Sequence, residues 1–217
     1  AGIFDGENHT IYNLKISSGD RVGLFGDQWQ INTEIKNFTL DGVDINGGEY
    51  VGGVLARTAS TKLINVHVKN ASIKATHYAG GVLGYGYTSI LGCSAKNVTI
   101  LCVPNTITNG FDNGDKVGGI VGCMFSGKIE DCSANNITLT GYRDIGGIVG
   151  MISNGDGPVS AKNNNAANIN ICVDQVTNHY GTKDTNAGGV IGRNIGAITE
   201  NNTESEINIQ YKVNNPA

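Results

Sequence analysis

One short glycine-centred segment recurs six times along this chain, and it constrains the fold more than any other feature. Its copies lie at 22–26, 52–56, 80–84, 118–122, 146–150 and 188–192. Measured on the second glycine of each copy (Gly23 in the first), the steps are 30, 28, 38, 28 and 42 residues, so the base period is near 28. Self-similarity at a near-fixed period indicates a stacked repeat architecture.

A second pattern follows each glycine segment and alternates apolar with polar residues. Its fullest copy contains Ile35, Phe38, Leu40, Val43 and Ile45. The Phe38-x-Leu40 and Val43-x-Ile45 pairs have a period of two, which predicts strands with one buried face. The two-residue interruptions between the apolar pairs shift the phase, as a corner between two strands requires.

Asparagine and its substitutes occupy these interruptions. We expect one corner at Asn13, Asn37, Asn65, Gly92, Asp131 and Asn163, and a second at Gly42, Asn70, Asn97, Asn136 and Asn168. Asn and Gly tolerate the left-handed backbone that such bends need. The glycine pairs predict a place where a side chain would clash or where the backbone must bend.

The predicted fold is therefore all-β: a right-handed, single-stranded parallel β-helix of six to seven coils with about 28 residues per coil. We expect one domain over 1–217, with a half repeat at 2–16 and insertions at 101–117 and 172–187. The full repeats are expected at 22–45, 52–73, 80–100, 118–139, 146–171 and 188–209.

Composition excludes several classes of function. The formal net charge is −4 and only 16% of residues are charged, so the basic patch that nucleic-acid binding needs is missing. No apolar run approaches about 20 residues, so no transmembrane helix is expected. The five cysteines form no CxxC pair. They are predicted to be small buried residues, with a disulfide between neighbouring coils as the open alternative.

The glycine segments resemble the GLUG-type repeats of bacterial surface proteins. The resemblance is carried by Val22-Gly23-Leu24-Phe25-Gly26 and its copies, and by the opening Phe4-Asp5-Gly6-Glu7-Asn8-His9-Thr10-Ile11. It covers residues 4–209, nearly the whole chain. Such repeats accompany secreted proteases and adhesins without being catalytic themselves. The resemblance implies an extracellular or cell-surface, adhesin-like module that belongs to a larger polypeptide or is monomeric.

Aromatic residues near the glycine segments are the first candidates for ligand binding. Trp29, Tyr87 and Phe125 lie at the same place in three repeats, and Tyr85 is close by. If Tyr87 stacks directly on Phe125, the rings form a strip suited to sugars. The alternative is that these rings only cover the apolar edge of the sheet.

The two insertions are the second candidates, because both follow the same predicted strand and so leave one edge of the rod. They contribute Asp112, Asp115, His179 and Tyr180 as candidate ligand contacts. The segment from Asp112 to Asp115 resembles a calcium loop but lacks the glutamate at the twelfth position, which favours a simple Asx-Gly turn. No metal site or cofactor is expected.

No catalytic residues emerge from the sequence. The outward ladders do not place carboxylates in adjacent coils, and the four histidines are scattered. We therefore expect a non-enzymatic surface or secreted module that binds a glycan or a host or matrix protein. Two alternatives remain: a polysaccharide lyase or glycoside hydrolase with its site at the insertions, and a structural stalk within a larger surface protein.

Overall fold

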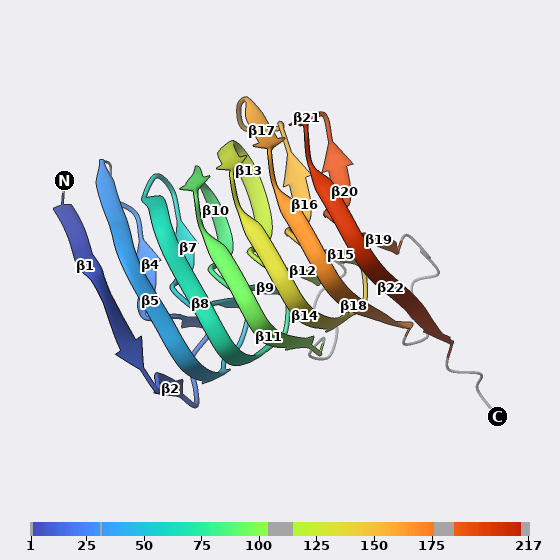
Figure 1. Cartoon of the computed structure of the whole chain (residues 1–217), viewed down its shortest axis with the longest axis horizontal. Helices are drawn as coiled ribbons and strands as arrows, with labels where there is room; N and C mark the ends of the chain where they lie inside the picture. Colours follow the sequence, from blue (N-terminus) through green and yellow to red (C-terminus); the bar gives the residue numbers. More distant parts are fainter. Residues whose placement is uncertain (1, 31, 104–114, 176–184, 214–217) are drawn as a thin grey trace.

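The computed structural model describes residues 2–30, 32–103, 115–175 and 185–213. Every regular element in these ranges is a β-strand, and none of them is a helix. The repeats follow one another across the molecule, with β1 (Gly2–Tyr12) at one end and β22 (Thr203–Val213) at the other (Figure 1). The all-β class predicted from the sequence is confirmed.

A small sheet contains the strand that leads into each glycine pair. Its six strands are parallel, and each pairs with its counterpart in the neighbouring repeats. They are β3 (Arg21–Val22), β6 (Tyr50–Gly52), β9 (Tyr78–Gly80), β12 (Lys116–Gly118), β15 (Asp144–Gly146) and β19 (Asn186–Gly188).

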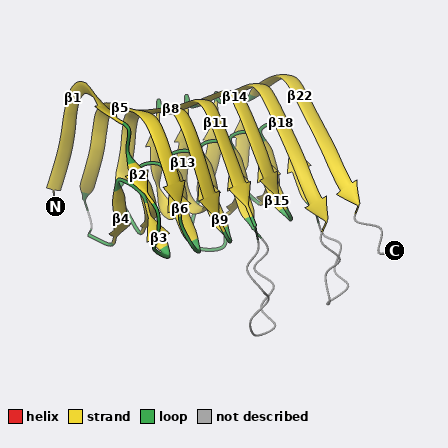
Figure 2. Ribbon diagram, turned by 90° about the horizontal axis from the view of Figure 1, so that it is seen from below, coloured by secondary structure: helices red, strands yellow, loops and turns green. Residues whose placement is uncertain are grey.

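The larger sheet has 16 strands and curls round the interior (Figure 2). One row of it follows the glycine pairs: β4 (Phe25–Gln28), β7 (Leu55–Thr58), β10 (Leu83–Leu91), β13 (Val121–Glu130), β16 (Val149–Ser153) and β20 (Ile191–Ile195). The other row comprises β1, β2 (Lys15–Ile16), β5 (Thr33–Asn46), β8 (Lys62–Ala75), β11 (Ser94–Cys102), β14 (Ser133–Gly141), β18 (Asn165–Gln175) and β22. Two short strands, β17 (Val159–Lys162) and β21 (Ile198–Glu200), lie between these rows in the last repeats.

Pairing is in register from repeat to repeat. Gly52 pairs with Gly80, and the chain of partners continues through Gly118 and Gly146 to Gly188. Strands separated by the two longer glycine spacings, of 38 and 42 residues, pair in the same register as strands separated by 28 residues. The segments 104–114 and 176–184 follow β11 and β18, which occupy equivalent places in the long-strand row with β14 between them.

The interior is built from ladders of aliphatic side chains. One ladder runs along the long-strand row through Ile16, Ile45, Ile73, Ile100, Leu139, Ile171 and Ile209. Its five central members are nearly inaccessible to solvent and belong to one continuous core. Burial of each such side chain contributes about 2 kcal/mol, so the alternation seen in the sequence is the main source of stability.

The corners are stabilised by left-handed residues whose side chains bond to one another. All eleven predicted corner residues have positive φ, between 51° and 77°. At the second corner, the side-chain amide of Asn136 donates to Asn97 Oδ1 (2.9 Å), and that of Asn97 donates to Asn70 Oδ1 (3.0 Å). Each Asn therefore supplies both the backbone conformation and a link to the next repeat.

One corner assignment from the sequence is wrong. Asn13 was expected at the first corner, but its backbone N–H donates to the Asp41 carbonyl oxygen (2.8 Å) and it lies beside Gly42. It therefore belongs to the second corner. The corresponding first-corner residues of β1 are Glu7 and Asn8, which also have positive φ.

The glycine pairs lie where the chain bends between the two sheets. A Cβ on Gly119 would overlap with the carbonyl oxygen of Gly147 in the next repeat, and a Cβ on Gly118 would overlap with the carbonyl oxygen of Val121. The same overlaps occur at the glycine pairs of the neighbouring repeats. The expected clash is confirmed, since no side chain fits at either position.

The last repeat is shifted by one residue at its start. Ile198 pairs with Ser160 and is 58% exposed. Thr199 instead occupies the interior ladder position that Ala161 holds in the preceding repeat.

Candidate binding surface

Two ladders of outward-facing side chains flank the glycine bend and contact each other along the stack. The first, on the small sheet, is Arg21, Tyr50, Tyr78, Lys116, Asp144 and Asn186. The second, on the row after the bend, is Asp27, Arg57, Tyr85, Cys123, Met151 and Arg193. We call these the two facing ladders. Repetition of the backbone thus brings one residue of each ladder together in every repeat.

The aromatic members of these ladders form a connected surface. The Tyr50 and Tyr78 rings are stacked, with centroids 4.9 Å apart and planes 3° apart. Tyr85 meets both edge-on, at 5.5 Å from Tyr50 and 5.2 Å from Tyr78. These distances and angles are those preferred by interacting aromatic rings.

Tyr87 and Phe125 extend this surface toward β13. Their rings lie 5.6 Å apart with planes 26° apart, and Tyr85 lies 5.4 Å from Phe125. The hydroxyls of Tyr85 and Tyr87 are 3.0 Å apart and share a hydrogen bond. Tyr85, Tyr87 and Phe125 are all half-buried, so part of each ring faces solvent.

Trp29 joins the surface through an arginine. The Arg57 guanidinium carbon lies 4.6 Å from the centroid of the Trp29 ring and 5.0 Å from that of Tyr50. Asp27 holds the guanidinium in place, with Arg57 Nη2 donating at 2.8 Å and Nε at 3.3 Å. Burial lowers the pKa of Arg57, but the hydrogen bonds and charge of Asp27 raise it by more, so the cation is retained. Trp29 itself is 50% exposed.

The hydroxyls of Tyr50, Tyr78 and Tyr85 stay protonated. Burial raises the pKa of Tyr78 and of Tyr85, and for Tyr85 the hydrogen bond with Tyr87 adds to the effect. The pKa of Tyr50 is also raised, first by burial and then by the Glu49 carboxylate. These phenols therefore remain hydrogen-bond donors as well as acceptors at neutral pH.

In the repeats that follow the tyrosines both facing ladders become buried, and the first becomes polar. Lys116 is 7% exposed and Asp144 is fully buried, and the Asn186 amide donates to Asp144 Oδ1 at 2.7 Å. Burial lowers the pKa of Lys116 and raises that of Asp144. Cys123 and Met151 fill the space opposite and pack with Tyr78.

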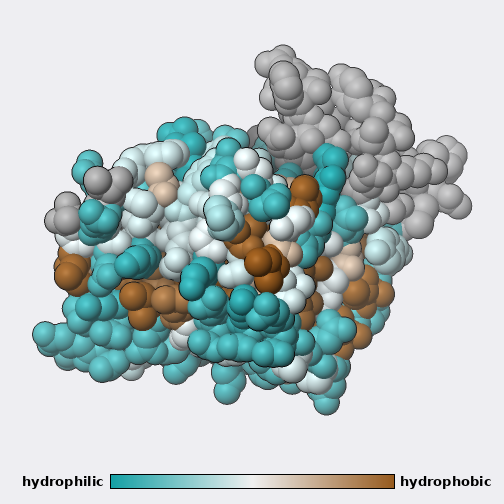
Figure 3. Space-filling view, turned by 90° about the horizontal axis from the view of Figure 1, so that it is seen from above, coloured by the Kyte–Doolittle hydropathy of each residue, from teal (hydrophilic) through white to brown (hydrophobic). Residues whose placement is uncertain are grey.

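Figure 3 shows one face of the molecule, on which apolar side chains lie in separate groups along the long axis, among polar ones. The partly exposed rings of this surface are those of Trp29, Tyr50, Tyr85, Tyr87 and Phe125. At the Trp29 and Tyr50 end they meet Arg57, which pairs with Asp27, and Asp27 also pairs with Arg21. Such a mixture of aromatic rings, phenol hydroxyls and fixed charges is typical of surfaces that bind polar ligands with a flat apolar side.

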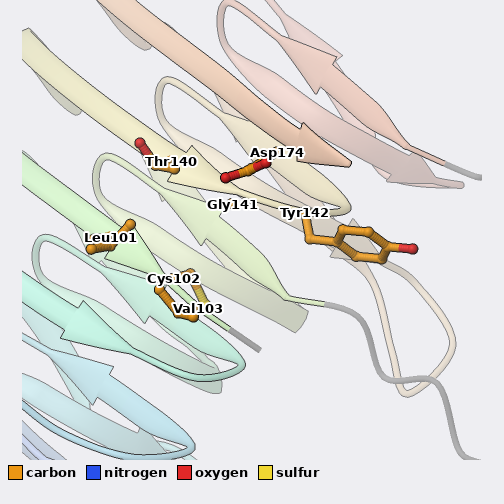
Figure 4. Close-up of a pocket in the computed structure, with 7 residues that line it drawn as sticks. All are labelled: Leu101, Cys102, Val103, Thr140, Gly141, Tyr142 and Asp174. Atoms are coloured by element: carbon orange, nitrogen blue, oxygen red, sulfur yellow. The ribbon is translucent and has the colours of Figure 1, made fainter. Parts of the chain in front are cut away.

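The edge where the long strands end carries a small cavity of about 60 Å³ (Figure 4). Seven residues line it: Leu101, Cys102, Val103, Thr140, Gly141, Tyr142 and Asp174. Its size suits water or an ion and is too small for a sugar ring. It lies at the ends of β11, β14 and β18.

Asp115 lies inside the protein at this edge. Its carboxylate accepts a hydrogen bond from the backbone N–H of Tyr142 and lies beside the Cys102 thiol. Burial raises its pKa to about 7. Asp115 was expected as an exposed ligand contact, but its side chain is fully buried because it packs under the turn that leads to β15. The other three candidates of the insertions, Asp112, His179 and Tyr180, lie outside the described residues.

The aromatic residues predicted as ligand contacts are not all in direct contact with one another. Tyr85, Tyr87 and Phe125 come together, whereas Trp29 reaches them only through Arg57 and Tyr50. Tyr87 does not pair directly with Phe125, because a register shift between Gly86 and Tyr87 places it opposite Ser126. Phe125 is the extra residue of this bulge, and the rings stack despite it.

Tyr50 and Tyr78 were missed by sequence reasoning. Both stand two residues before a glycine pair, in the pattern Tyr-x-Gly-Gly at 50–53 and 78–81. The same position holds Lys116, Asp144 and Asn186 in the later repeats. A comparison of this position across repeats would have identified the first facing ladder.

Within the described ranges, no three His, Cys, Asp or Glu side chains are grouped so that they could hold a metal ion. The same ranges include no helix with the length and apolar character needed to cross a membrane.

Comparison with known proteins finds only partial relatives. The immunoglobulin A1 protease of Streptococcus pneumoniae serotype 4 is 27% identical over 182 residues, covering 70% of this chain and 9% of the protease. That of Streptococcus sanguinis is 24% identical over 184 residues, with the same coverage. Halomucin of Haloquadratum walsbyi is 36% identical over 85 residues, covering 38% of this chain and 1% of halomucin.

No protein-family model matches the chain, and no solved structure is significantly similar to it. The chain spans less than a tenth of the length of the curated relatives that it matches. Sequence of this kind therefore recurs as a small part of much longer proteins.

Proposed function

We propose that this chain is a non-enzymatic, extracellular binding module whose aromatic surface takes a carbohydrate. We define that surface as Trp29, Tyr50, Tyr78, Tyr85, Tyr87 and Phe125, with Arg57. The observation that carries the proposal is the half-exposed Tyr87–Phe125 stack next to the hydrogen-bonded Tyr85–Tyr87 hydroxyl pair.

The scaffold we infer is a right-handed parallel β-helix of six to seven coils. The in-register parallel pairing of each strand with its counterpart one repeat later supports this interpretation, since a chain that returns to the same sheet in every repeat must wind as a coil. Crossovers between parallel strands are right-handed in nearly all proteins, which supports a right-handed coil. The GLUG-type glycine segments support an origin among bacterial surface repeats.

The extracellular location is supported by the partial relatives. Two of them are proteases named for immunoglobulin A1, an antibody, and such a protease meets its substrate outside the cell that makes it. The small share of each relative that is matched supports a role as one module of a longer polypeptide. An adhesin-like role, in which the module attaches its parent protein to a glycan-coated surface or matrix, fits both points.

Carbohydrate is the ligand class that this chemistry fits best. A pyranose ring has a face of C–H groups that packs on an aromatic ring and an edge of hydroxyls that needs hydrogen-bond partners. Tyr87 and Phe125 supply the aromatic face, while the hydrogen-bonded hydroxyls of Tyr85 and Tyr87 lie at its edge. Arg57 and Asp27 lie further along the surface, so a longer oligosaccharide would also meet a fixed charge pair.

The test is a glycan array that includes matrix glycoproteins, followed by calorimetric titration of any ligand found. Tyr87→Ala is expected to weaken binding at least about tenfold, equivalent to about 1.4 kcal/mol. The matched control is Tyr12→Ala, because Tyr12 is 66% exposed but lies on β1, away from the aromatic surface.

Equal affinity in the two variants would contradict the assignment of the site, and failure of the wild type to bind any glycan would contradict the function. Release of reducing ends from a bound polysaccharide would contradict the non-enzymatic interpretation.

A further inference from the structure

The last repeat breaks the pattern of interior ladders by introducing a charge. One interior ladder runs through Ile11, Leu40, Val68, Ala95, Ala134, Ala166 and Glu204. Every member except Glu204 is aliphatic. Glu204 lies on β22, the outermost strand of the row at the C-terminal end of the stack (Figure 1). Its side chain is exposed.

The carboxylate of Glu204 occupies the position that a backbone carbonyl oxygen occupies in the other repeats. In earlier repeats, the atom that a Cβ on the second glycine would meet first is the carbonyl oxygen of the equivalent glycine one repeat further on. This holds for Gly81 against Gly119, and for Gly147 against Gly189. At Gly189 itself the first atom is Glu204 Oε2. The carboxylate oxygen thus stands where the carbonyl oxygen of a following repeat would stand.

A further repeat could not be stacked on this end without burying that charge. The incoming chain would displace the carboxylate from its position over Gly189 and force it among Ile207 and the apolar ladder. Burying an unpaired carboxylate is strongly unfavourable, by several times the gain from one aliphatic contact. Inward-pointing charges are a known means of protecting the end of a sheet from pairing.

The opposite end of the stack has no charged residue at the corresponding ladder position. Ile11 stands there, with Phe4 on β1, Ile16 on β2 and Leu14 in the turn between these strands at neighbouring interior positions. Phe4 is 38% exposed. If two copies met head to tail, continuing the register, Glu204 of one would face Ile11 of the other, while Ile207 and Ile209 would face Leu14 and Ile16.

We propose that Glu204 closes the C-terminal end of the stack and prevents head-to-tail association of copies of this chain. The Ile207–Leu14 and Ile209–Ile16 contacts of such a junction are apolar, and the carboxylate of Glu204 would be buried beside them, so its charge opposes the junction. Removal of the charge exposes an end that matches the N-terminal end of another copy.

The experiment compares the oligomeric state of the 217-residue chain with that of Glu204→Ala, which restores the residue found in the three preceding repeats. Light scattering coupled to size exclusion, over a range of concentrations, should show a wild-type monomer and a concentration-dependent series for Glu204→Ala. We expect association at least about tenfold stronger than for the wild type. Glu200→Ala is the matched control, because Glu200 lies on β21 with its carboxylate outward, paired with Lys162 at 2.9 Å. It should remain monomeric.

Ile11→Glu in the Glu204→Ala background tests the direction of the contact. It places a charge at the N-terminal member of the same ladder and is expected to return the protein to a monomer. Glu204→Gln, which removes the charge but keeps the shape, is measured alongside so that the result does not depend on the fold of the alanine variant.

The proposal is overturned if folded Glu204→Ala and Glu204→Gln have the same mass distribution as Glu200→Ala at every concentration. It is also overturned if Ile11→Glu leaves their association unchanged. Neither result bears on glycan binding at Tyr85, Tyr87 and Phe125, since these residues lie on β10 and β13 in the middle of the stack.

Discussion

The interior ladders and the two facing ladders are built on the same sheets with the same register, yet they differ in the range of residue types that they contain. Along the interior, Ile45, Ile73, Ile100, Leu139 and Ile171 are nearly interchangeable in size and chemistry. Along the facing ladders, a tyrosine, a lysine and an aspartate succeed one another at the same position, at Tyr78, Lys116 and Asp144. The repeating backbone fixes the positions of the side chains in both kinds of ladder. Close packing restricts the residue type only in the interior.

This difference separates stability from recognition. A buried aliphatic residue is held by neighbours above, below and across the interior, so a change there alters several repeats. A half-buried ring such as Tyr85 contacts other rings on the outer side of the sheet and is partly exposed to solvent. Function can therefore vary along the outer ladders at little cost to the fold, and measurements on matched variants can test that separation.

The largest effect is expected at the bend that separates the two kinds of ladder. Gly119→Ala puts a Cβ into the carbonyl oxygen of Gly147, which is backbone and cannot move aside without breaking the register. We expect a loss of at least about 3 kcal/mol in the free energy of unfolding, measured by urea denaturation. The control is Gly155→Ala, whose Cβ would meet only Ser153 Oγ at 3.6 Å and should change stability by less than about 0.5 kcal/mol. Similar stabilities for the two variants would show that the bend tolerates side chains.

The next prediction compares the stability lost by truncating an interior residue with that lost by truncating a residue of the aromatic surface. Ile137 is fully buried in the core, and Ile137→Ala is expected to cost about 3 kcal/mol through lost burial and the cavity left behind. Tyr87→Ala, in the half-exposed stack with Phe125, is expected to cost about 1 kcal/mol while abolishing most of the glycan affinity. Thermal and chemical denaturation of both variants checks this. Equal losses of stability would mean that the aromatic surface is part of the core, and the separation drawn above would fail.

The smallest effect concerns a polar group on the interior side. Burial raises the pKa of Asp115 to about 7 from 3.8, so the folded protein holds a proton that the unfolded chain releases more easily. The contribution of this group to stability is therefore fully present below about pH 4 and is lost as the pH rises to about 7. The free energy of unfolding of the wild type relative to Asp115→Asn should fall by more than about 1 kcal/mol between these limits. A difference that does not depend on pH would place the carboxyl in solvent.

Much of the fold could be predicted from the sequence because the repeat makes local rules visible several times over. The corner residues illustrate this: Asn97 and Asn136 need the left-handed conformation, and both were placed from spacing alone. The need for glycine at 118 and 119 was likewise predicted, although the atom that excludes a side chain was not. Asn13 was misplaced because its repeat is incomplete and offered no glycine segment to count from.

The candidate surface was predicted only in part, and the missing part has a physical cause. Arg57 between Trp29 and Tyr50 depends on how closely the bend brings the two facing ladders together, which spacing along the chain does not reveal. The bulge at Phe125 shifts the register by one residue without a sequence signal that counting could detect. The burial of Asp115 depends on the turn after β14, which lies in another repeat.

The constant register across unequal steps has a consequence for how such a protein can change. The chain between Gly81 and Gly119 is 38 residues and that between Gly147 and Gly189 is 42, yet β12 and β19 pair as their neighbours do. Lengthening a connection at this edge costs little, since each doubling of a flexible closure adds only about 0.6 kcal/mol. The connection between β14 and β15, which is short in this chain, lies between the two long ones. A peptide inserted there is expected to leave the register of the neighbouring strands unchanged.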